Sequence, residues 1–274
     1  MDFTIGYIVL CTFGFFVCNF FYLAHNVHLF FVNFALLIHL FTEQMKFGVI
    51  TFPGSNCDQD MISVLRDEMG QKVESIWHKE TDLKGADFIV LPGGFSYGDY
   101  LRSGAIARFS PIMDQVINHA KKGGYVLGIC NGFQILLESG LLEGSLLHNN
   151  NQQFICKNIW LKPSSLSAPI SKSLNRDKSY KIPIAHGEGR FYAPKDIVNK
   201  IQDHDGVIFK YCNESGIINE DANPNGSLLN IAGICNQKKN VFGMMPHPER
   251  ASSKSLANED GKDLFNSLLN NCNK

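Results

Sequence analysis

The sequence predicts an α/β fold, an open and mostly parallel sheet flanked by helices, with an added β-rich later portion. Three short apolar runs, 46–52, 73–77 and 87–91, have the composition of strands that are covered on both faces. A helical pattern lies between the first two runs, so the order begins β-α-β-β. A further apolar run, 125–127, passes through a sharp turn directly into another helix.

Each element from Lys46 onward follows from a local pattern. Strands are expected where short apolar runs stop at Gly, Pro or Asn, and helices where apolar residues recur every three or four positions behind a capping residue. In the first half these are, in order, a strand at 46–52, a helix at 57–69, strands at 73–77 and 87–91, a helical stretch at 105–122 interrupted near Pro111, a strand at 125–127 and a helix that ends at Ser139.

The second half is richer in strands, and their alternation indicates antiparallel pairing. The expected elements are strands at 154–161, 180–185, 207–211, 228–235 and 241–245, and a closing helix at 256–270. The Ser- and Pro-rich stretch 163–178 is expected to be a surface loop. We expect residues 45–274 to form one domain.

The composition fits an ordinary globular protein and excludes several classes of function. The chain has 274 residues, of which 45% are apolar and 19% charged, and its formal net charge is −1. Nothing in this balance suggests binding to nucleic acid or to an anionic membrane. The eight cysteines include no Cys-x-x-Cys pair, so they indicate neither a zinc site nor a disulfide scaffold. Reduced thiols in a cytoplasmic protein are the simplest account.

Residues 1–44 differ from the rest of the chain. Positions 3–42 hold no Asp, Glu, Lys or Arg, and their length and apolarity would allow a membrane span. However, no Lys or Arg precedes Lys46 to anchor such a span, and neither the basic segment nor the cleavage site of a signal peptide is visible. We expect 1–44 to be an apolar leader outside the fold that reflects a mis-chosen start codon. A membrane anchor and a transit segment are the alternatives.

The chemistry is predicted at one turn, Gly128-Ile129-Cys130-Asn131-Gly132. The spacing Gly-x-Cys-x-Gly is the thiol version of the nucleophile elbow, a strained turn too tight for side chains two residues either side of the nucleophile. The helix that follows points its N-terminus at the sulfur, which favours the thiolate. The turn alone leaves open a buried structural cysteine.

His247 and Glu249, at the end of the last expected strand, supply what a thiolate nucleophile needs, a base and a group that orients the base. Residues i and i+2 of an extended segment point the same way, so Glu249 can hold one imidazole nitrogen while the other serves Cys130. The histidines of the later chain show no ligand spacing, so no metal is expected. These are His78, His119, His148, His186 and His204.

Acyl transfer to a thiol also needs two N–H donors for the oxyanion. The backbone N–H of Asn131, next to the nucleophile, is one candidate. The other is the N–H of Gly94 or Phe95, in a glycine-dense loop at 92–104 that follows a strand and can bring bare backbone close to a ligand. No Gly-Lys-Ser/Thr follows, so a phosphate cradle is poorly supported, and a flexible surface loop is the alternative. These groups together predict formation and hydrolysis of a thioester.

Six blocks of sequence carry a family resemblance: FPGSNCDQD, LPGGFSYGDYLRSGAIAR, GICNGFQIL, AHGEGRF, NPNGSLLNIAGI and MMPHPER. Over residues 52–250 they resemble the class I (triad) glutamine amidotransferases, and among these the glutaminase subunits of phosphoribosylformylglycinamidine synthase. The elbow and the His-Pro-Glu segment are shared across that class, whereas GEGRF and NPNGS are more specific to the purine-pathway members.

The resemblance implies a flavodoxin-like fold and the hydrolysis of glutamine to glutamate and ammonia. Cys130 would be the nucleophile, His247 the acid and base, and Glu249 the group that orients His247. Further residues would contact the substrate. These are the side chain of Gln134 and the backbone around His186, Gly187 and Glu188.

The resemblance also implies partners. The ammonia would pass to a large ATP-dependent synthetase subunit that forms formylglycinamidine ribonucleotide in de novo purine biosynthesis, and a small third subunit would bridge the two. ATP and Mg²⁺ would belong to the synthetase, and this chain would hold no cofactor. Two alternatives remain. One is a hydrolase of another γ-glutamyl or peptide bond that needs no partner, and the other is a non-catalytic binding module, against which the intact triad argues.

Overall fold

The computed structural model describes residues 44–272, so the leader expected over 1–44 lies outside the described residues except for Gln44. The strands are β1 (Lys46–Thr51), β2 (Lys72–Trp77), β3 (Phe88–Leu91), β4 (Tyr125–Ile129), β5 (Ser145–Leu147), β6 (Ile155–Pro163), β7 (Tyr180–His186), β8 (Arg190–Tyr192), β9 (Val207–Cys212), β10 (Ile231–Cys235) and β11 (Val241–Met244). The α-helices are α2 (Asp58–Ser63), α3 (Pro111–Lys121), α4 (Asn131–Glu138), α5 (Pro169–Lys172), α6 (Lys195–Asp203) and α7 (Asp260–Asn271).

Within the described part of the chain, nine strands form one sheet in the order β2-β1-β3-β4-β11-β10-β9-β6-β7, and β5 pairs with β8 separately. Neighbours from β2 to β11 run parallel. Neighbours from β11 to β7 run antiparallel. The predicted fold class is therefore confirmed, with a parallel first half and a β-rich later half joined at β11.

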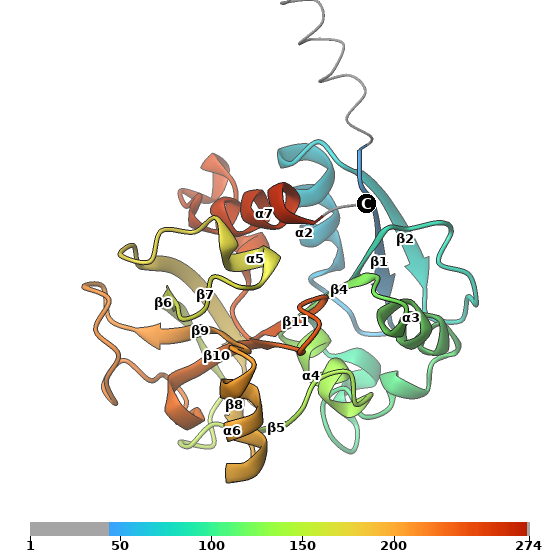
Figure 1. The fold of residues 1–274 in the computed structure, drawn as a ribbon. Coiled ribbons are helices and arrows are strands. Elements are labelled where there is room, and N and C mark those ends of the chain that lie inside the picture. Colours follow the sequence, from blue (N-terminus) through green and yellow to red (C-terminus); the bar gives the residue numbers. More distant parts are fainter. Residues whose placement is uncertain (1–43, 273–274) are drawn as a thin grey trace, which may run out of the picture. The chain divides into compact units, whose positions relative to one another are not determined.

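Helices cover the sheet on both faces because the chain adds successive strands in two opposite directions along the sheet. The crossover β1-α2-β2 goes one way and β3-α3-β4 goes the other, and since such crossovers are right-handed, α2 and α3 fall on opposite faces. Figure 1 shows α2, α5 and α7 on one side of the sheet and α4 and α6 on the other. The loops after β1 and β3 consequently meet at one sheet edge, where Ser55 and Gly94 form a β-bridge.

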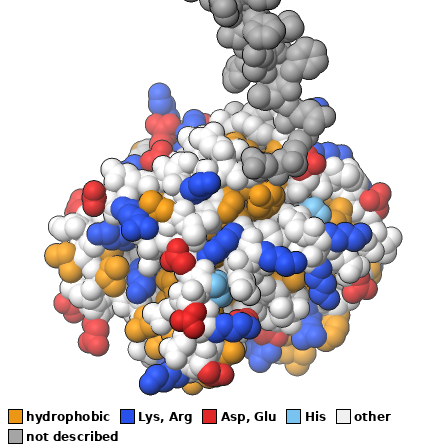
Figure 2. All heavy atoms as spheres, viewed as in Figure 1, with side chains coloured by type: hydrophobic (Ala, Val, Ile, Leu, Met, Phe, Trp, Pro, Cys, Tyr) orange, Lys and Arg blue, Asp and Glu red, His pale blue; other side chains and the backbone are white. Residues whose placement is uncertain are grey.

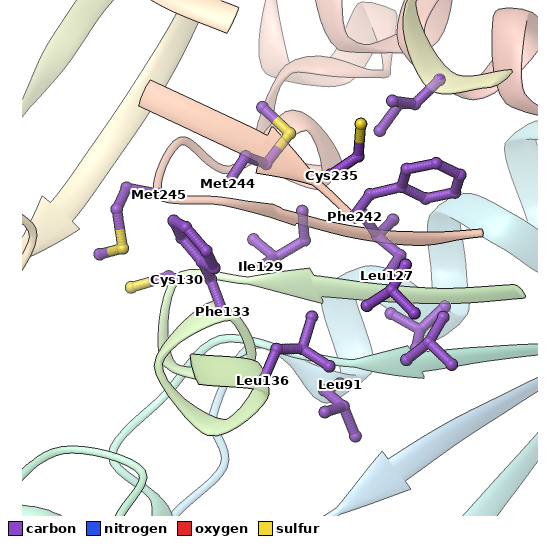
Figure 3. Packing of buried hydrophobic residues seen from close by; sticks show 14 of the residues in the cluster. Leu91, Leu127, Ile129, Cys130, Phe133, Leu136, Cys235, Phe242, Met244 and Met245 are labelled. Carbon is purple, nitrogen blue, oxygen red and sulfur yellow. The ribbon is translucent and has the colours of Figure 1, made fainter. Parts of the chain in front are cut away.

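The core beneath this edge is built by β3, β4, β11 and α4. Phe133 of α4 packs so closely over Gly243 of β11 that an added Cβ there would lie 2.1 Å from its ring. Figure 3 shows Cys130 at the end of this apolar cluster, beside Phe133 and Met245. The nucleophile candidate thus lies at the end of this closely packed core, at the junction of β4 and α4.

Several element predictions were wrong. The expected surface loop 163–178 contains α5, whose buried Ile170 packs near α7. The helix expected over 57–69 is α-helical only to Ser63 and continues as a π-helix to Glu68. The strand expected from Leu228 begins only at Ile231, after a turn of 3₁₀-helix. Pairing with distant elements decides these boundaries, and local pattern does not contain it.

Every helix described in residues 44–272 falls short of the length and apolarity that crossing a membrane would require. On the face drawn in Figure 2, Lys and Arg side chains are interspersed with Asp and Glu. That mixture agrees with the near-neutral net charge of the chain.

Candidate active site

The candidate site lies where β4 and β11 end side by side. The two strands pair in parallel with Ile129 opposite Met244, and the N–H of Cys130 donates to the Met244 carbonyl at 2.8 Å. The segment after β11 is fixed by the N–H of His247, which donates to the Pro183 carbonyl at 2.9 Å. Cys130 and His247, which are far apart in the chain, are therefore held just beyond the ends of neighbouring strands of one sheet.

The turn at Cys130 has the strained conformation that the elbow predicts, with φ 51° and ψ −106°. Both glycines are required by close packing. A Cβ on Gly128 would lie 2.6 Å from the Gly132 carbonyl oxygen, and one on Gly132 would lie 1.9 Å from the Leu91 carbonyl oxygen. α4 begins at the next residue, Asn131, so its N-terminal N–H groups and dipole face the sulfur.

His247 and Glu249 form a buried pair, with 2.6 Å between Nδ1 and Oε1. The expected extended geometry was wrong, because Pro248–Ala251 forms a turn of 3₁₀-helix. This turn brings the carboxylate back onto the imidazole, so the contact forms by a different route. A hydrogen bond to Nδ1 leaves Nε2 as the atom that can exchange a proton with a substrate.

The electrostatics of His247 follow from burial and two neighbours. Burial alone would lower its pKa, but the negative charge of Glu249, and then that of Cys130, outweigh burial and raise the pKa well above its ordinary value. Nε2 is buried and has no hydrogen-bond partner among residues 44–272. An imidazolium in this position has a proton available for a leaving group.

The oxyanion candidates differ in how free their N–H groups are. The N–H of Phe95 donates to the Gly54 carbonyl at 3.0 Å, whereas within residues 44–272 the N–H of Gly94 has no protein acceptor. Gly94 has φ +140°, and a Cβ on it would lie 2.8 Å from the backbone nitrogen of Asn56, so only glycine fits. The N–H of Asn131 lies in the first turn of α4, where no intrahelical acceptor exists. Gly94 and Asn131 are thus the better-placed pair.

Gln134 and Glu188, predicted as substrate contacts, lie together. Nε2 of the buried Gln134 donates to the Glu188 carbonyl at 2.7 Å, and its Oε1 accepts from Nδ2 of Asn131 at 2.9 Å. The Cys130 thiol approaches the Ala185 carbonyl at 3.6 Å. The segment that begins at Ala185 therefore runs past both the nucleophile and Gln134.

His186 and Gly187 are held by one residue, Asn149. Oδ1 of Asn149 lies 3.0 Å from Nδ1 of His186, and the N–H of Asn149 donates to the Gly187 carbonyl at 2.9 Å. Burial, and then the positive charge of His247, lower the pKa of His186 to about 4. His186 is therefore neutral at physiological pH and adds no second positive charge to the site.

Three buried polar residues of the site were not singled out from the sequence: Asn149, Tyr211 and Asn225. Nδ2 of Asn149 donates to the His186 carbonyl and Nδ2 of Asn225 donates to the Gly189 carbonyl, each at 2.8 Å, which fixes the backbone of this segment. Burial raises the pKa of the Tyr211 phenol, which stays protonated. A run of three asparagines and the NPNGS block were the available signals, whereas Tyr211 sits unmarked within a strand pattern.

Asp99, in the loop at 92–104, has a strained backbone and a carboxylate whose ionised form is disfavoured by burial. Its φ is 51°, and Tyr97 and Leu101 also have positive φ, at 56° and 74°. Burial raises the pKa of Asp99 to about 6 although Ser103 donates a hydrogen bond to it, and the charge of Glu188 adds to the rise. Strained backbone and an unfavourable buried charge in one loop are typical of functional sites.

Replacing Asp99 by Asn is expected to stabilise the fold at neutral pH. Because the folded-state pKa lies above the unfolded one, the ionised carboxylate favours unfolding once the pH has risen through 6. After allowance for solvent screening, the free energy of unfolding should rise by on the order of 1 kcal/mol at pH 8, and the gain should vanish near pH 4. Urea unfolding at both pH values, with exposed Asp221→Asn as the control, checks this. A gain of equal size at both pH values would contradict it.

One group among the described residues could offer ligands to a metal ion. Ligand atoms of Cys57, His247 and Glu249 lie within 4.8 Å of one another. They are already engaged, since His247 and Glu249 bond each other and the Cys57 sulfur accepts from Nη2 of Arg250 at 3.2 Å. A guanidinium cation beside the sulfur disfavours a second cation there.

A cavity of about 340 Å³ lies at the other end of the sheet and is separate from this site. It is bounded by the start of β11 and the ends of β10, α3 and α6, with Lys121, Lys200 and His204 among its lining residues. In parallel sheets, chemistry gathers at the carboxyl ends of the strands, which is the end where Cys130 stands.

Acyl transfer through a thioester is the chemistry that this arrangement suits. The family model of the CobB/CobQ-like glutamine amidotransferase domain matches residues 44–266, and the chain belongs to this family.

Individual relatives agree with the family assignment. The chain is 54% identical over 222 residues to phosphoribosylformylglycinamidine synthase subunit PurQ of Chlorobium chlorochromatii, covering 81% of this chain and 95% of the relative. It is 53% identical to the PurQ subunit of Trichormus variabilis, over 82% of this chain and 97% of the relative. Among solved structures, PurLQS from Thermotoga maritima matches with a TM-score of 0.72 at 38% identity, covering 83% of this chain and 98% of that one.

Proposed function

We propose that this chain acts as the glutaminase subunit of phosphoribosylformylglycinamidine synthase. It hydrolyses glutamine and supplies the ammonia to the subunit that makes formylglycinamidine ribonucleotide in de novo purine biosynthesis. The observation that carries the proposal is the buried His247–Glu249 pair beside an elbow cysteine, in a chain about half identical to PurQ subunits. We assign the amidotransferase domain to residues 45–274, in line with the family match over 44–266.

The first half of the reaction forms a thioester. The Cys130 thiolate attacks the side-chain amide carbon of glutamine, and the N–H groups of Gly94 and Asn131 donate to the oxyanion. When the C–N bond breaks, Nε2 of His247 gives its proton to the nitrogen, which leaves as ammonia. Glu249 keeps Nδ1–H directed at itself and stabilises the imidazolium throughout.

The second half returns the enzyme to its starting state. A water molecule gives a proton to Nε2 of His247 and its oxygen attacks the thioester carbon. The same two N–H groups bind the second oxyanion, and the C–S bond breaks to regenerate the Cys130 thiolate. The product leaves as the side-chain carboxylic acid, which loses its proton to water and becomes glutamate.

We assign glutamine binding to the pocket edge beside the elbow. Gln134 would contact the substrate through one Nε2 hydrogen and one Oε1 lone pair, which its bonds to Glu188 and Asn131 leave free. The backbone around His186, Gly187 and Glu188 would bind the amino-acid head, and the hydrogen bonds from Asn149 support this by holding that backbone in place. No cofactor is needed for these steps.

The proposed partner is a large synthetase subunit, which would use ATP and Mg²⁺, together with a small bridging subunit, all in the cytoplasm. Two exposed side chains next to the site support a docking surface, since Tyr100 is 75% exposed and Leu101 is 92% exposed. Phe95 and Phe154 add a half-exposed aromatic pair with 6.2 Å between ring centroids. Enclosing this mouth would let ammonia pass without becoming ammonium in bulk water.

Ammonia release from glutamine, measured with and without the synthetase subunit, tests the proposal. We expect stimulation by the partner of about tenfold or more, equivalent to ~1.4 kcal/mol of activation free energy. Full activity without the partner would favour an independent hydrolase. Inactivity under both conditions would favour a binding module and overturn the proposal.

A further inference from the structure

We propose that the side chain of Asn131 is a positioning residue, which sets the amide orientation of Gln134 for glutamine and fastens the loop at 92–104 to the nucleophile helix. The inference rests on the proposed glutaminase function. It concerns the side chain alone, whereas the oxyanion role above concerns the backbone N–H of the same residue.

The hydrogen-bonding capacity of the Asn131 amide is used almost completely inside the protein. Asn131 is buried, with 2% of its surface exposed. Its Oδ1 accepts from the N–H of Ser96 at 3.2 Å. Its Nδ2 donates to Oδ1 of Asp99 at 3.3 Å and to Oε1 of Gln134 at 2.9 Å. Both amide hydrogens are thereby committed, so this residue has no donor left for substrate.

These contacts fix which way round each amide points. The N–H of Ser96 can only donate, so the Asn131 atom that faces it is Oδ1, and Nδ2 then faces Gln134. Gln134 must in turn present Oε1, which leaves its Nε2 directed at the Glu188 carbonyl, 2.7 Å away. Ser96, Asn131, Gln134 and Glu188 thus form a relay of hydrogen bonds. A backbone donor at one end and a backbone acceptor at the other fix the orientation of the two side-chain amides between them.

The relay also ties together segments that are distant in sequence. Ser96 and Asp99 belong to the loop at 92–104, and Glu188 belongs to the segment after β7. Without the Asn131 amide, the Glu188 carbonyl alone holds the Gln134 amide, which loses its second anchor, and the loop loses two of its bonds to α4. The consequence falls on glutamine recognition, while the elbow and the His247–Glu249 pair keep their own contacts.

Asn131→Ala is the direct test, and Asn240→Ala is a matched control. Asn240 is also buried and also makes three side-chain hydrogen bonds, with the Ala120 and Gly124 carbonyls and with Nδ2 of Asn236. It lies at the opposite end of β4 and β11. Both variants should lose similar stability, so a difference between them reports on position and not on folding.

The readout is the rate of Cys130 labelling by two reagents, an electrophilic chloroketone analogue of glutamine and iodoacetamide. In Asn131→Ala we expect labelling by the analogue to slow about tenfold or more, corresponding to ~1.4 kcal/mol, and labelling by iodoacetamide to stay within about twofold. KM for glutamine in the assembled enzyme should rise while synthesis from ammonia is unchanged. In Asn240→Ala the ratio of the two labelling rates should match that of the unmodified protein.

A double substitution shows whether Asn131 acts through Gln134. In a Gln134→Ala background, Asn131→Ala should change labelling by the analogue no more than about twofold further, because coupled residues are non-additive. If Asn131→Ala does not fold, Asn131→Asp at pH 8 keeps the acceptor for Ser96 but loses both donors, and should show the same change in ratio.

Three results would overturn the inference: additive effects in the double variant, equal slowing with both reagents, or the same ratio change in Asn240→Ala. Failure of the glutaminase function itself would look different. The unmodified protein would then react with iodoacetamide but not with the glutamine analogue, and both proposals would fall together.

Discussion

Cys130→Ala is expected to abolish synthesis that depends on glutamine in the assembled enzyme, yet to leave synthesis from added ammonium salt intact. Under the proposed function, the thiol takes part only in releasing ammonia, while the amidine would be formed on the partner. Loss of a nucleophile that acts through a covalent intermediate lowers kcat by about 10⁴-fold or more. The fold should survive, because the site is supported by the packing of Phe133 over Gly243 and does not depend on the sulfur.

Parallel assays with glutamine and with ammonium salt measure this separation, and the exposed Cys156 supplies the matched control. Cys156→Ala should retain both activities. Mass spectrometry after treatment with a glutamine-like electrophile should find the adduct on Cys130. Loss of ammonia-dependent synthesis in Cys130→Ala, or an adduct on Cys57, would sink the assignment.

Glu249→Gln should lower kcat by about 10⁴-fold with little change in KM for glutamine. Glutamine at position 249 can still bond the imidazole, but it removes the charge that outweighs burial and raises the pKa of His247. The imidazolium then loses its proton at lower pH, and an amide NH₂ facing Nδ1 favours the wrong tautomer. KM is spared because Glu249 bonds His247 within the protein and is fully buried.

Steady-state kinetics of the assembled enzyme between pH 6 and 9 provide the measurement. Asp60→Asn is the control, since this nearby carboxylate pairs with Arg250 and makes no bond to His247. It should keep kcat within about threefold, as expected for a half-exposed ion pair. A fall of less than tenfold in Glu249→Gln would mean that the buried pair is structural.

The sequence predicted what depends on short-range spacing. The elbow at Cys130 could be read because glycine two residues to each side has a steric reason, which the close approach to Leu91 bears out. The parallel half of the sheet could be read because its strands are short and apolar. The pairing of His247 with Glu249 was predicted from an extended segment, whereas a 3₁₀ turn makes the contact.

What the sequence could not predict depends on partners far along the chain. Nothing near Asn131 indicates that its amide meets Ser96 and Asp99. The choice of Gly94 over Phe95 as the freer donor depends on where the Gly54 carbonyl lies. Likewise, 163–178 reads as a polar loop until α7 is present to bury Ile170.

The side-by-side placement of β4 and β11 has a consequence for how the protein comes to be active in the cell. Synthesis delivers the cysteine midway and the histidine near the end, so a nascent or truncated chain carries the thiol without its base. Under the proposed function, glutamine would meet no working site until β11 has inserted between β4 and β10. The appearance of hydrolytic activity would then report that the central strands of the sheet have paired.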